Sequence, residues 1–163
     1  MTDMNCKLRY FLFAIVALIS MTSLHAQDFS SYHKGNIECL EAELDGSLTL
    51  RVTGAGKNRS DAEEQAKKNA VYEIIFKGIV GSVSGKITKP LVTEVNARER
   101  YEEYFDQFFA DGGEYKNFVS KADAKRSSKE KTKKKYENTC RLTVRVLRSD
   151  LKAHLKKDGI IKK

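Results

Sequence analysis

The sequence predicts an α+β domain: an antiparallel sheet of about four strands, with two main helices packed on one face and a short C-terminal helix. The order of patterns is one reason. Two alternating segments are followed by two of helical period, two more extended segments and a short helix. The second reason is the segment from Leu48 to Ile79, where a strand passes through a glycine corner into an alanine-lined helix.

Residues 1–26 have the features of a secretory signal peptide. Lys7 and Arg9 precede the apolar run 10–19, and Ala26 before Gln27 is the expected cleavage site. A membrane anchor is less favoured, because the run is about half of the roughly 20 residues that span a bilayer. The mature chain has no other candidate span, so we expect an exported protein that is periplasmic or associated with the outer membrane.

The mature chain divides into a polar entry arm (27–36), a single α+β domain (37–158) and a tail (159–163). Residues 37–44 read as a strand, which Asp45-Gly46 turns onto the alternating strand beginning at Leu48. A helix is expected to follow a capping box at Ser60–Glu63 and to end near Gly78–Gly81. Alanines four residues apart along this helix would let it lie close to the sheet; they are Ala62, Ala66 and Ala70.

The middle of the chain predicts a loop and a second helix. Residues 81–90 are rich in glycine and serine and end at the single proline, which is typical of a mobile or partner-binding loop. A helix is expected from Glu94 to Ala110, ended by Asp111-Gly112-Gly113. Aromatic residues share one face of it, and we expect them in the core rather than in an exposed groove; they are Tyr101, Tyr104, Phe105, Phe108 and Phe109.

The last part of the chain predicts a strand at Tyr115–Ala124, a strand at Tyr136–Leu147 and a helix from Ser149 to Gly159. A lysine-rich hairpin tip, 121–135, separates the two strands and has eight Lys or Arg residues against two acidic ones. Such a run suits an anionic surface, but it is equally typical of a solvated loop. The candidate binding residues are Lys125, Arg126, Lys129, Lys131, Lys133, Lys134 and Lys135.

Two cysteines, Cys39 and Cys140, remain after cleavage at Ala26. In an oxidising compartment, two cysteines favour one disulfide. Cys140 alternates in phase with core residues, but Cys39 alternates with Glu41 and Glu43. A bulge or an altered strand register would be needed to bring Cys39 inward. The alternative, two separate buried thiols, therefore stays open.

The segment from Leu50 to Ala62, with Ala66 and Ala70 after it, resembles a family of small exported bacterial domains. The family includes small outer-membrane-associated lipoproteins and the amino-terminal domain of the flagellar assembly protein T. The shared pattern is an apolar strand, a Gly-x-Gly corner, a polar cap and alanines spaced by four. This chain has no cysteine at the cleavage site, unlike the lipoproteins. The resemblance implies a non-catalytic envelope or assembly component and implies no catalytic residues.

The sequence indicates no catalytic, cofactor or metal site. Gly54-Ala55-Gly56 could face a phosphate, but the helix after it opens with acidic residues that would repel one, so a tight corner is favoured. His33 and His154 have no serine, cysteine or acid nearby in a recognisable catalytic arrangement. Adjacent glutamates, such as Glu102 and Glu103, point in different directions along a helix.

The chain carries 30 Lys and Arg against 22 Asp and Glu. An exported protein of this charge meets anionic lipid and envelope polymers before it meets nucleic acid. We therefore expect a non-catalytic binding or assembly module with envelope proteins as partners and a basic loop for anionic surfaces. The alternatives are a nucleic-acid-binding protein that uses the same lysines and a secreted hydrolase of unknown type.

Overall fold

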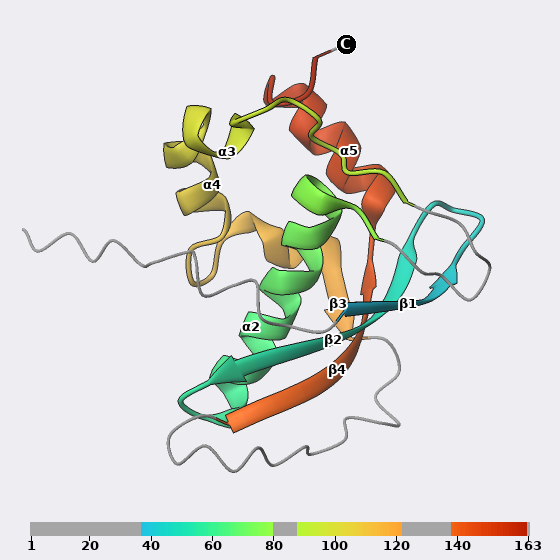
Figure 1. Cartoon of the computed structure of the whole chain (residues 1–163), viewed down its shortest axis with the longest axis vertical. Helices are drawn as coiled ribbons and strands as arrows, with labels where there is room; N and C mark the ends of the chain where they lie inside the picture. Colours follow the sequence, from blue (N-terminus) through green and yellow to red (C-terminus); the bar gives the residue numbers. More distant parts are fainter. Residues whose placement is uncertain (1–36, 80–87, 122–137, 163) are drawn as a thin grey trace, which may run out of the picture. The chain divides into compact units, whose positions relative to one another are not determined.

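The computed structural model describes residues 37–79, 88–121 and 138–162, which form the predicted α+β domain (Figure 1). Its antiparallel sheet has the order β1-β2-β4-β3. The strands are β1 (Ile37–Ala42), β2 (Leu48–Gly56), β3 (Val119–Lys121) and β4 (Asn138–Val146). The predicted signal peptide, entry arm and most of the loop at 81–90 and of the lysine-rich tip lie outside the described residues.

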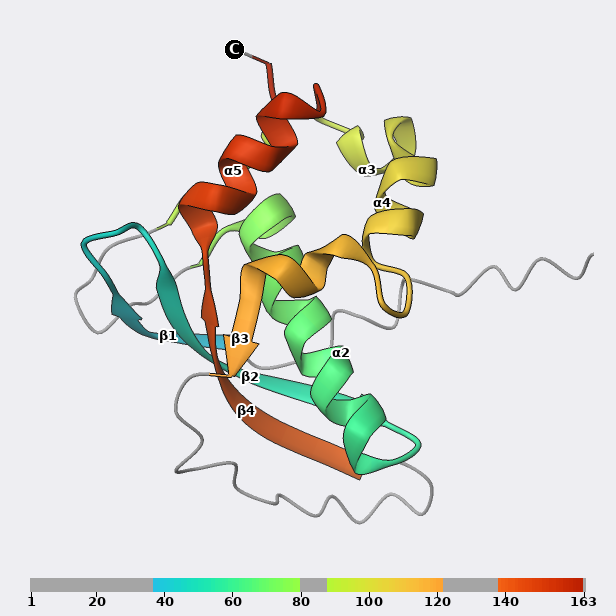
Figure 2. The same ribbon diagram turned by 180° about the vertical axis from the view of Figure 1, so that it is seen from behind.

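Helix α2 (Arg59–Tyr72) covers one face of the sheet and lies very close to β2 (Figures 1 and 2). A Cβ atom on Gly54 would be 2.2 Å from the carbonyl oxygen of Ala62 and 2.4 Å from the nitrogen of Ala66. Both alanines are fully buried. Gly54 therefore serves close packing of the helix on the strand. The predicted turn at Gly54-Ala55-Gly56 is wrong, because these residues continue β2 and pair with β4, and the chain turns only after Gly56.

The predicted cap of α2 at Ser60 is wrong. The helix begins at Arg59, and the capping residue is Asn58, whose extended backbone precedes the first turn. Asn58 Oδ1 accepts a hydrogen bond from the backbone nitrogen of Asp61 at 2.9 Å, and Asn58 Nδ2 donates to Asp61 Oδ2 at 2.9 Å. Ser60 already belongs to the first turn, so Asn58 and Asp61 fulfil the capping roles predicted for Ser60 and Glu63.

The last turn of the helix widens into a π-helix, η2 (Glu73–Lys77), and ends at Gly78 as predicted. Here two helix carbonyls bond to a later segment: Leu91 N donates to Ile74 O at 3.1 Å, and Val92 N donates to Ile75 O at 2.9 Å. The chain after the predicted loop is thereby attached to the end of this helix.

The predicted helix from Glu94 to Ala110 is two shorter ones, α3 (Ala97–Arg100) and α4 (Glu102–Phe108). Tyr101 leaves the helical region, with φ −115° and ψ 34°, and breaks the helix between them. The core interpretation is confirmed for Phe105, Phe108 and Phe109, which are buried, whereas Tyr101 and Tyr104 are partly exposed. Aromatic contacts with the end of the α2–η2 helix hold α4 in the helical layer; the ring centroids of Phe76 and Phe105 are 4.8 Å apart.

The strand predicted at Tyr115–Ala124 is wrong in its first part. Residues Glu114–Phe118 form a 3-10 helix, η3, and β3 begins only at Val119. The tighter turn places both Tyr115 and Phe118 in the core, where a strand would have placed one aromatic outward. Tertiary contacts of the aromatic rings therefore decide this local structure.

Tyr115 and its neighbour Lys116 join η3 to α2 through Glu64. Glu64 Oε2 accepts a hydrogen bond from the Tyr115 hydroxyl at 2.9 Å and pairs with Lys116 Nζ at 3.3 Å, and Glu64 Oε1 accepts from Lys67 Nζ at 2.6 Å. Partial burial raises the pKa of Glu64, but the bonds from Lys67, Tyr115 and Lys116 outweigh it and lower the pKa from 4.5 to about 2. Glu64 is therefore ionised throughout the physiological range.

Lys68, also on α2, is only 3% exposed. Its Nζ atom lies 2.8 Å from Asp111 Oδ1 and 5.6 Å from the centre of the Tyr115 ring. The hydrogen bond from Lys68 lowers the pKa of Asp111. This pair fastens α2 to the glycine turn that follows α4.

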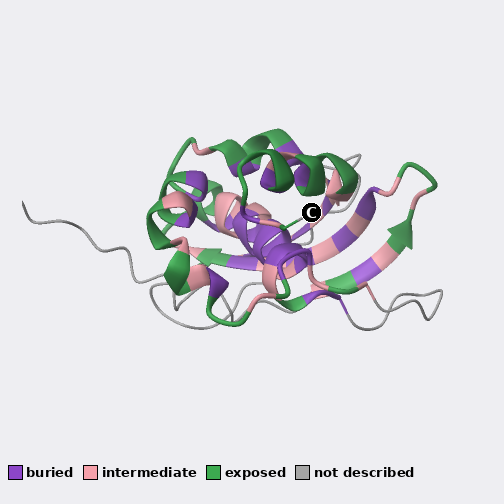
Figure 3. Cartoon of the chain, turned by 90° about the horizontal axis from the view of Figure 1, so that it is seen from above, coloured by how far each residue is buried: buried purple, intermediate pink, exposed green. Residues whose placement is uncertain are grey.

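Helix α5 (Arg148–Lys157) follows β4 and ends before Gly159, as predicted. Buried and partly exposed residues alternate along β4 and along most of β2, and Figure 3 shows such alternation as purple and pink bands on the sheet. Leu151 and Leu155 are the buried residues of α5. In the described part of the chain, no helix has the length and apolar character needed to cross a membrane.

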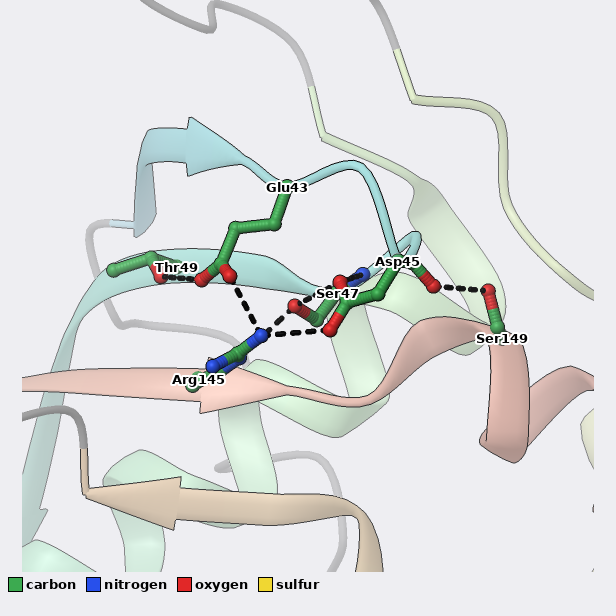
Figure 4. Close-up of polar contacts among 6 residues, drawn as sticks. All are labelled: Glu43, Asp45, Ser47, Thr49, Arg145 and Ser149. Carbon is green, nitrogen blue, oxygen red and sulfur yellow. Dashed lines mark hydrogen bonds and ion pairs between the residues drawn. The ribbon is translucent and has the colours of Figure 1, made fainter.

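A polar network ties the β1–β2 turn to β4 and α5 (Figure 4). Arg145 Nη2 lies 2.6 Å from Glu43 Oε2 and 2.7 Å from Asp45 Oδ2. Hydrogen bonds from the side chain and backbone of Ser47, followed by the charge of Arg145, lower the pKa of Asp45. Ser149 Oγ donates to the backbone oxygen of Asp45 at 3.2 Å. The polar and charged groups of this network are partners of one another, so we assign the network a structural role.

Candidate functional site

A surface hollow of about 420 Å³ is lined by residues of α4, η3 and the C-terminal end of α5. Its walls combine two aromatic rings, glycine backbone and a larger number of polar and charged side chains. The lining residues are Tyr104, Gln107, Phe108, Gly112, Gly113, Glu114, Lys116, Asn117 and Asp158.

Local structure brings the acidic wall of the hollow together. His154 and Asp158 are four residues apart at the end of α5 and therefore face the same side of the helix. Glu114 reaches them from the start of η3, directly after the glycine turn. Gly112 has φ +85°, and a Cβ on Gly113 would be 2.4 Å from the carbonyl oxygen of Phe108. Only glycine suits a turn of this shape, so the turn positions Glu114.

The three side chains form a compact cluster of possible metal ligands. His154 Nε2 lies 2.9 Å from Glu114 Oε2 and 3.1 Å from Asp158 Oδ2. One ligand atom from each residue can be chosen so that all three lie within 4.8 Å of one another. The ring nitrogen and the two carboxylate oxygens thus converge on a single point beside the hollow.

Neighbouring groups hold this cluster in place. The Tyr104 hydroxyl donates to Asp158 Oδ2 at 2.7 Å. Burial raises the pKa of Tyr104, and the hydrogen bond to Asp158 raises it further, so its hydroxyl remains a donor at physiological pH. The rings of Phe108 and Phe118 have centroids 6.2 and 5.0 Å from that of His154. One carboxylate is therefore oriented by a hydrogen bond, and the imidazole by aromatic packing.

The sequence pattern predicted no metal site and did not indicate that Glu114 and Asp158 lie beside His154. The His-x-x-x-Asp spacing at 154–158 was a usable signal, because residues four apart on a helix share a face. Glu114 could not have been found in this way. It is 40 positions from His154 in the sequence, and only the packing of η3 against α5 brings the two together.

The two cysteines do not form the predicted disulfide. A bulge between Cys39 and Glu41 is present, Cys39 and Cys140 are both buried, and their sulfurs are not bonded to each other. Cys39 pairs with Leu50 and Cys140 pairs with Gly54, on opposite sides of β2. At roughly 3.4 Å per residue and 4.8 Å per strand, they are well beyond the roughly 7 Å between Cα atoms that a disulfide tolerates.

The seven basic residues predicted to bind anionic surfaces lie outside the described residues. What the structure gives is the place where their segment rejoins the sheet. Asn138, the first residue of β4, pairs with Gly56 and donates from Nδ2 to the backbone oxygen of Lys57 at 2.8 Å. This corner is at the end of β4 opposite to α5.

Comparison of the chain with models of protein families, with curated proteins and with solved structures found no match.

Proposed function

We propose that this protein is a non-catalytic, exported component of the bacterial envelope that acts as a binding or assembly module, with its basic segment contacting an anionic surface. The observation that carries the proposal is the charge of residues 125–135, where seven Lys and Arg residues stand against Glu130 alone. Near an anionic membrane, each such residue contributes about 1 kcal/mol. The signal-peptide features of residues 1–26 support an envelope location.

The described residues where the chain resumes after the basic segment support the same proposal. The segment leads into β4 beside Lys57, which is itself exposed and adds a cation at this corner. From Asn138 to Val146, β4 extends over about 27 Å, at roughly 3.4 Å per residue, before the chain enters α5. A surface bound at the corner would therefore leave the other end of the domain open to a protein partner.

Binding to lipid vesicles tests the proposed electrostatic contact between the basic segment and an anionic surface. Cosedimentation of the mature protein with vesicles that contain an anionic phospholipid is compared with binding to purely zwitterionic vesicles. Replacing Lys131, Lys133, Lys134 and Lys135 with glutamine removes up to about 4 kcal/mol, which corresponds to a loss of affinity of up to roughly 1000-fold. The matched control replaces four exposed lysines near the C-terminus, Lys152, Lys156, Lys157 and Lys162. Equal binding by the tip variant and the wild type would reject an electrostatic role of the tip.

The location and the partners need a separate measurement. Crosslinking in cells, followed by mass spectrometry of the envelope fraction, should recover a chain that starts at Gln27 together with a small set of envelope proteins. A chain that keeps Met1 in the cytosol and binds nucleic acid with a steep salt dependence would instead support the nucleic-acid alternative.

A further inference from the structure

The cluster at the end of α5 contains a buried ring nitrogen without a hydrogen bond. His154 Nε2 has two carboxylate oxygens within 3.1 Å, yet among the described residues it makes no hydrogen bond of acceptable geometry, and the atom is buried. A cation at the point where Glu114, His154 and Asp158 converge would take the ring nitrogen as a ligand and offset the charges of the two carboxylates.

We propose that Glu114, His154 and Asp158 bind a divalent transition-metal ion, with Zn²⁺ as the best match. One imidazole and two carboxylates are ligands that zinc accepts, and the nitrogen disfavours Mg²⁺ and Ca²⁺, which prefer oxygen. This inference goes beyond the proposed function and does not depend on it.

The dimensions of the cluster fit such an ion after a small adjustment. Zinc lies about 2.0–2.2 Å from nitrogen and oxygen ligands, so two of its ligands can be at most about 4.4 Å apart. The three ligand atoms here lie within 4.8 Å of one another. The side chain of Glu114 is 61% exposed and can move by the few tenths of an ångström required, whereas His154 and Asp158 are held on one helix.

The surroundings supply the outer shell that metal sites need. Tyr104 donates to the Asp158 oxygen that faces the imidazole, and Phe108 and Phe118 pack on the His154 ring. Hydrogen bonds of this kind orient metal ligands, and losing one typically costs about 10- to 100-fold in affinity. Glu114 and Asp158 also line the hollow, so an ion with three protein ligands would have its remaining coordination position beside that space.

Titration with zinc chloride, followed by calorimetry, tests the proposal on the mature protein. We expect one equivalent of zinc to bind, and Co²⁺ in its place to give visible absorption bands of a low-coordinate site. Three variants each remove one ligand with little change of shape: Glu114→Gln, Asp158→Asn and His154→Phe, the last of which keeps an aromatic ring between its neighbours. Each should weaken binding by more than the roughly 10- to 100-fold typical of outer-shell changes.

Two further variants test whether the loss of zinc affinity is specific to the three proposed ligands and to their hydrogen-bonded neighbour. Asp150→Asn removes an exposed carboxylate from the same helix and should leave zinc affinity unchanged. Tyr104→Phe should lower the affinity about 10-fold and shift the Co²⁺ bands, because it frees the Asp158 carboxylate. Circular dichroism establishes that each variant is folded.

The proposal is overturned if the folded wild type takes up no zinc, or if it takes up zinc that none of the three ligand variants weakens. The latter outcome would place the ion elsewhere, for example at His33 or at the cysteines. Vesicle binding by these variants is expected to remain as in the wild type, so failure of the metal site and failure of the basic tip can be told apart.

Discussion

Replacing Glu64 with glutamine is expected to destabilise the protein at neutral pH and to have a much smaller effect in acid. The pKa of this carboxyl is about 2 in the folded protein, against 4.5 ordinarily, because the bonds from Lys67, Tyr115 and Lys116 outweigh the opposing effect of partial burial. Glutamine keeps the shape of the side chain and an oxygen that can accept from Tyr115. The substitution therefore removes mainly the charge.

The size of the effect follows from the pKa and the exposure of the side chain. A pKa lowered from 4.5 to about 2 corresponds to at most about 3 kcal/mol of stability. One third of the Glu64 side chain, 33%, is exposed, and solvent screening reduces the expected contribution to about 1–2 kcal/mol. Because the folded pKa is lower than the unfolded one, this contribution is complete above about pH 4.5 and is lost as the pH falls towards 2.

Urea unfolding of both proteins at neutral pH and at about pH 3 measures this difference. The Glu64→Gln variant should unfold with a free energy lower by about 1–2 kcal/mol at neutral pH, and the gap should shrink in acid. Glu103→Gln, which neutralises an exposed glutamate of α4, is the control and should stay within about 0.5 kcal/mol of the wild type. A gap that is the same at both pH values would refute the linkage to ionisation of Glu64.

Three further predictions concern packing and the cysteines. Gly54→Ala should lower the free energy of unfolding by about 3 kcal/mol, because its new Cβ would be 2.2 Å from a backbone oxygen of α2. Phe105→Ala should cost about 3–5 kcal/mol, since the ring is 1% exposed and leaves a cavity among aromatic neighbours. Alkylation of the mature protein in denaturant without a reductant should label two thiols, Cys39 and Cys140, as read by intact mass.

Each of these has a matched comparison. Gly112→Ala meets no atom within 4 Å and should cost only the roughly 1–2 kcal/mol of a left-handed residue, so an equal loss in Gly54→Ala would contradict the close approach. Leu44 is fully exposed, and Leu44→Ala should change stability by less than about 0.5 kcal/mol. An unlabelled mature chain that gains two labels only after reduction would show a disulfide instead.

Local sequence patterns correctly predicted the helices and strands whose structure depends on which of their own side chains are buried. Alternation in β2 and β4 and the alanines of α2 predicted the sheet and the helix that covers it, because burial on one face imposes these periods directly. The break of the helix at Tyr101 has no such signature in the sequence, because the helical spacing of the aromatic residues continues across it. A helical spacing of apolar residues predicts which face of a segment is buried, but it does not predict whether the segment is one unbroken helix.

The candidate site depends on contacts that no local pattern encodes. Asp158 and His154 share a helix and could have been paired from their spacing, but Glu114 joins them only through the unexpected 3-10 turn. For the cysteines, the expected oxidising compartment favoured a disulfide. The strand register across β2, which the sequence does not specify, places the two residues too far apart.

The order of the strands has a consequence for when this protein can fold. β4 is the last strand in the chain, and it pairs both with β2, where Val146 faces Leu48, 98 residues earlier, and with β3. Pairings of such high contact order are slow, and here none of them can form before the final quarter of the chain is available. Before β4 emerges, the chain holds the β1–β2 hairpin, the helices that follow it and β3, but not the strand that joins β2 to β3. If the protein is exported as we propose, this delay would keep the chain incompletely folded, and so able to enter a translocation channel, until its last strand has been synthesised.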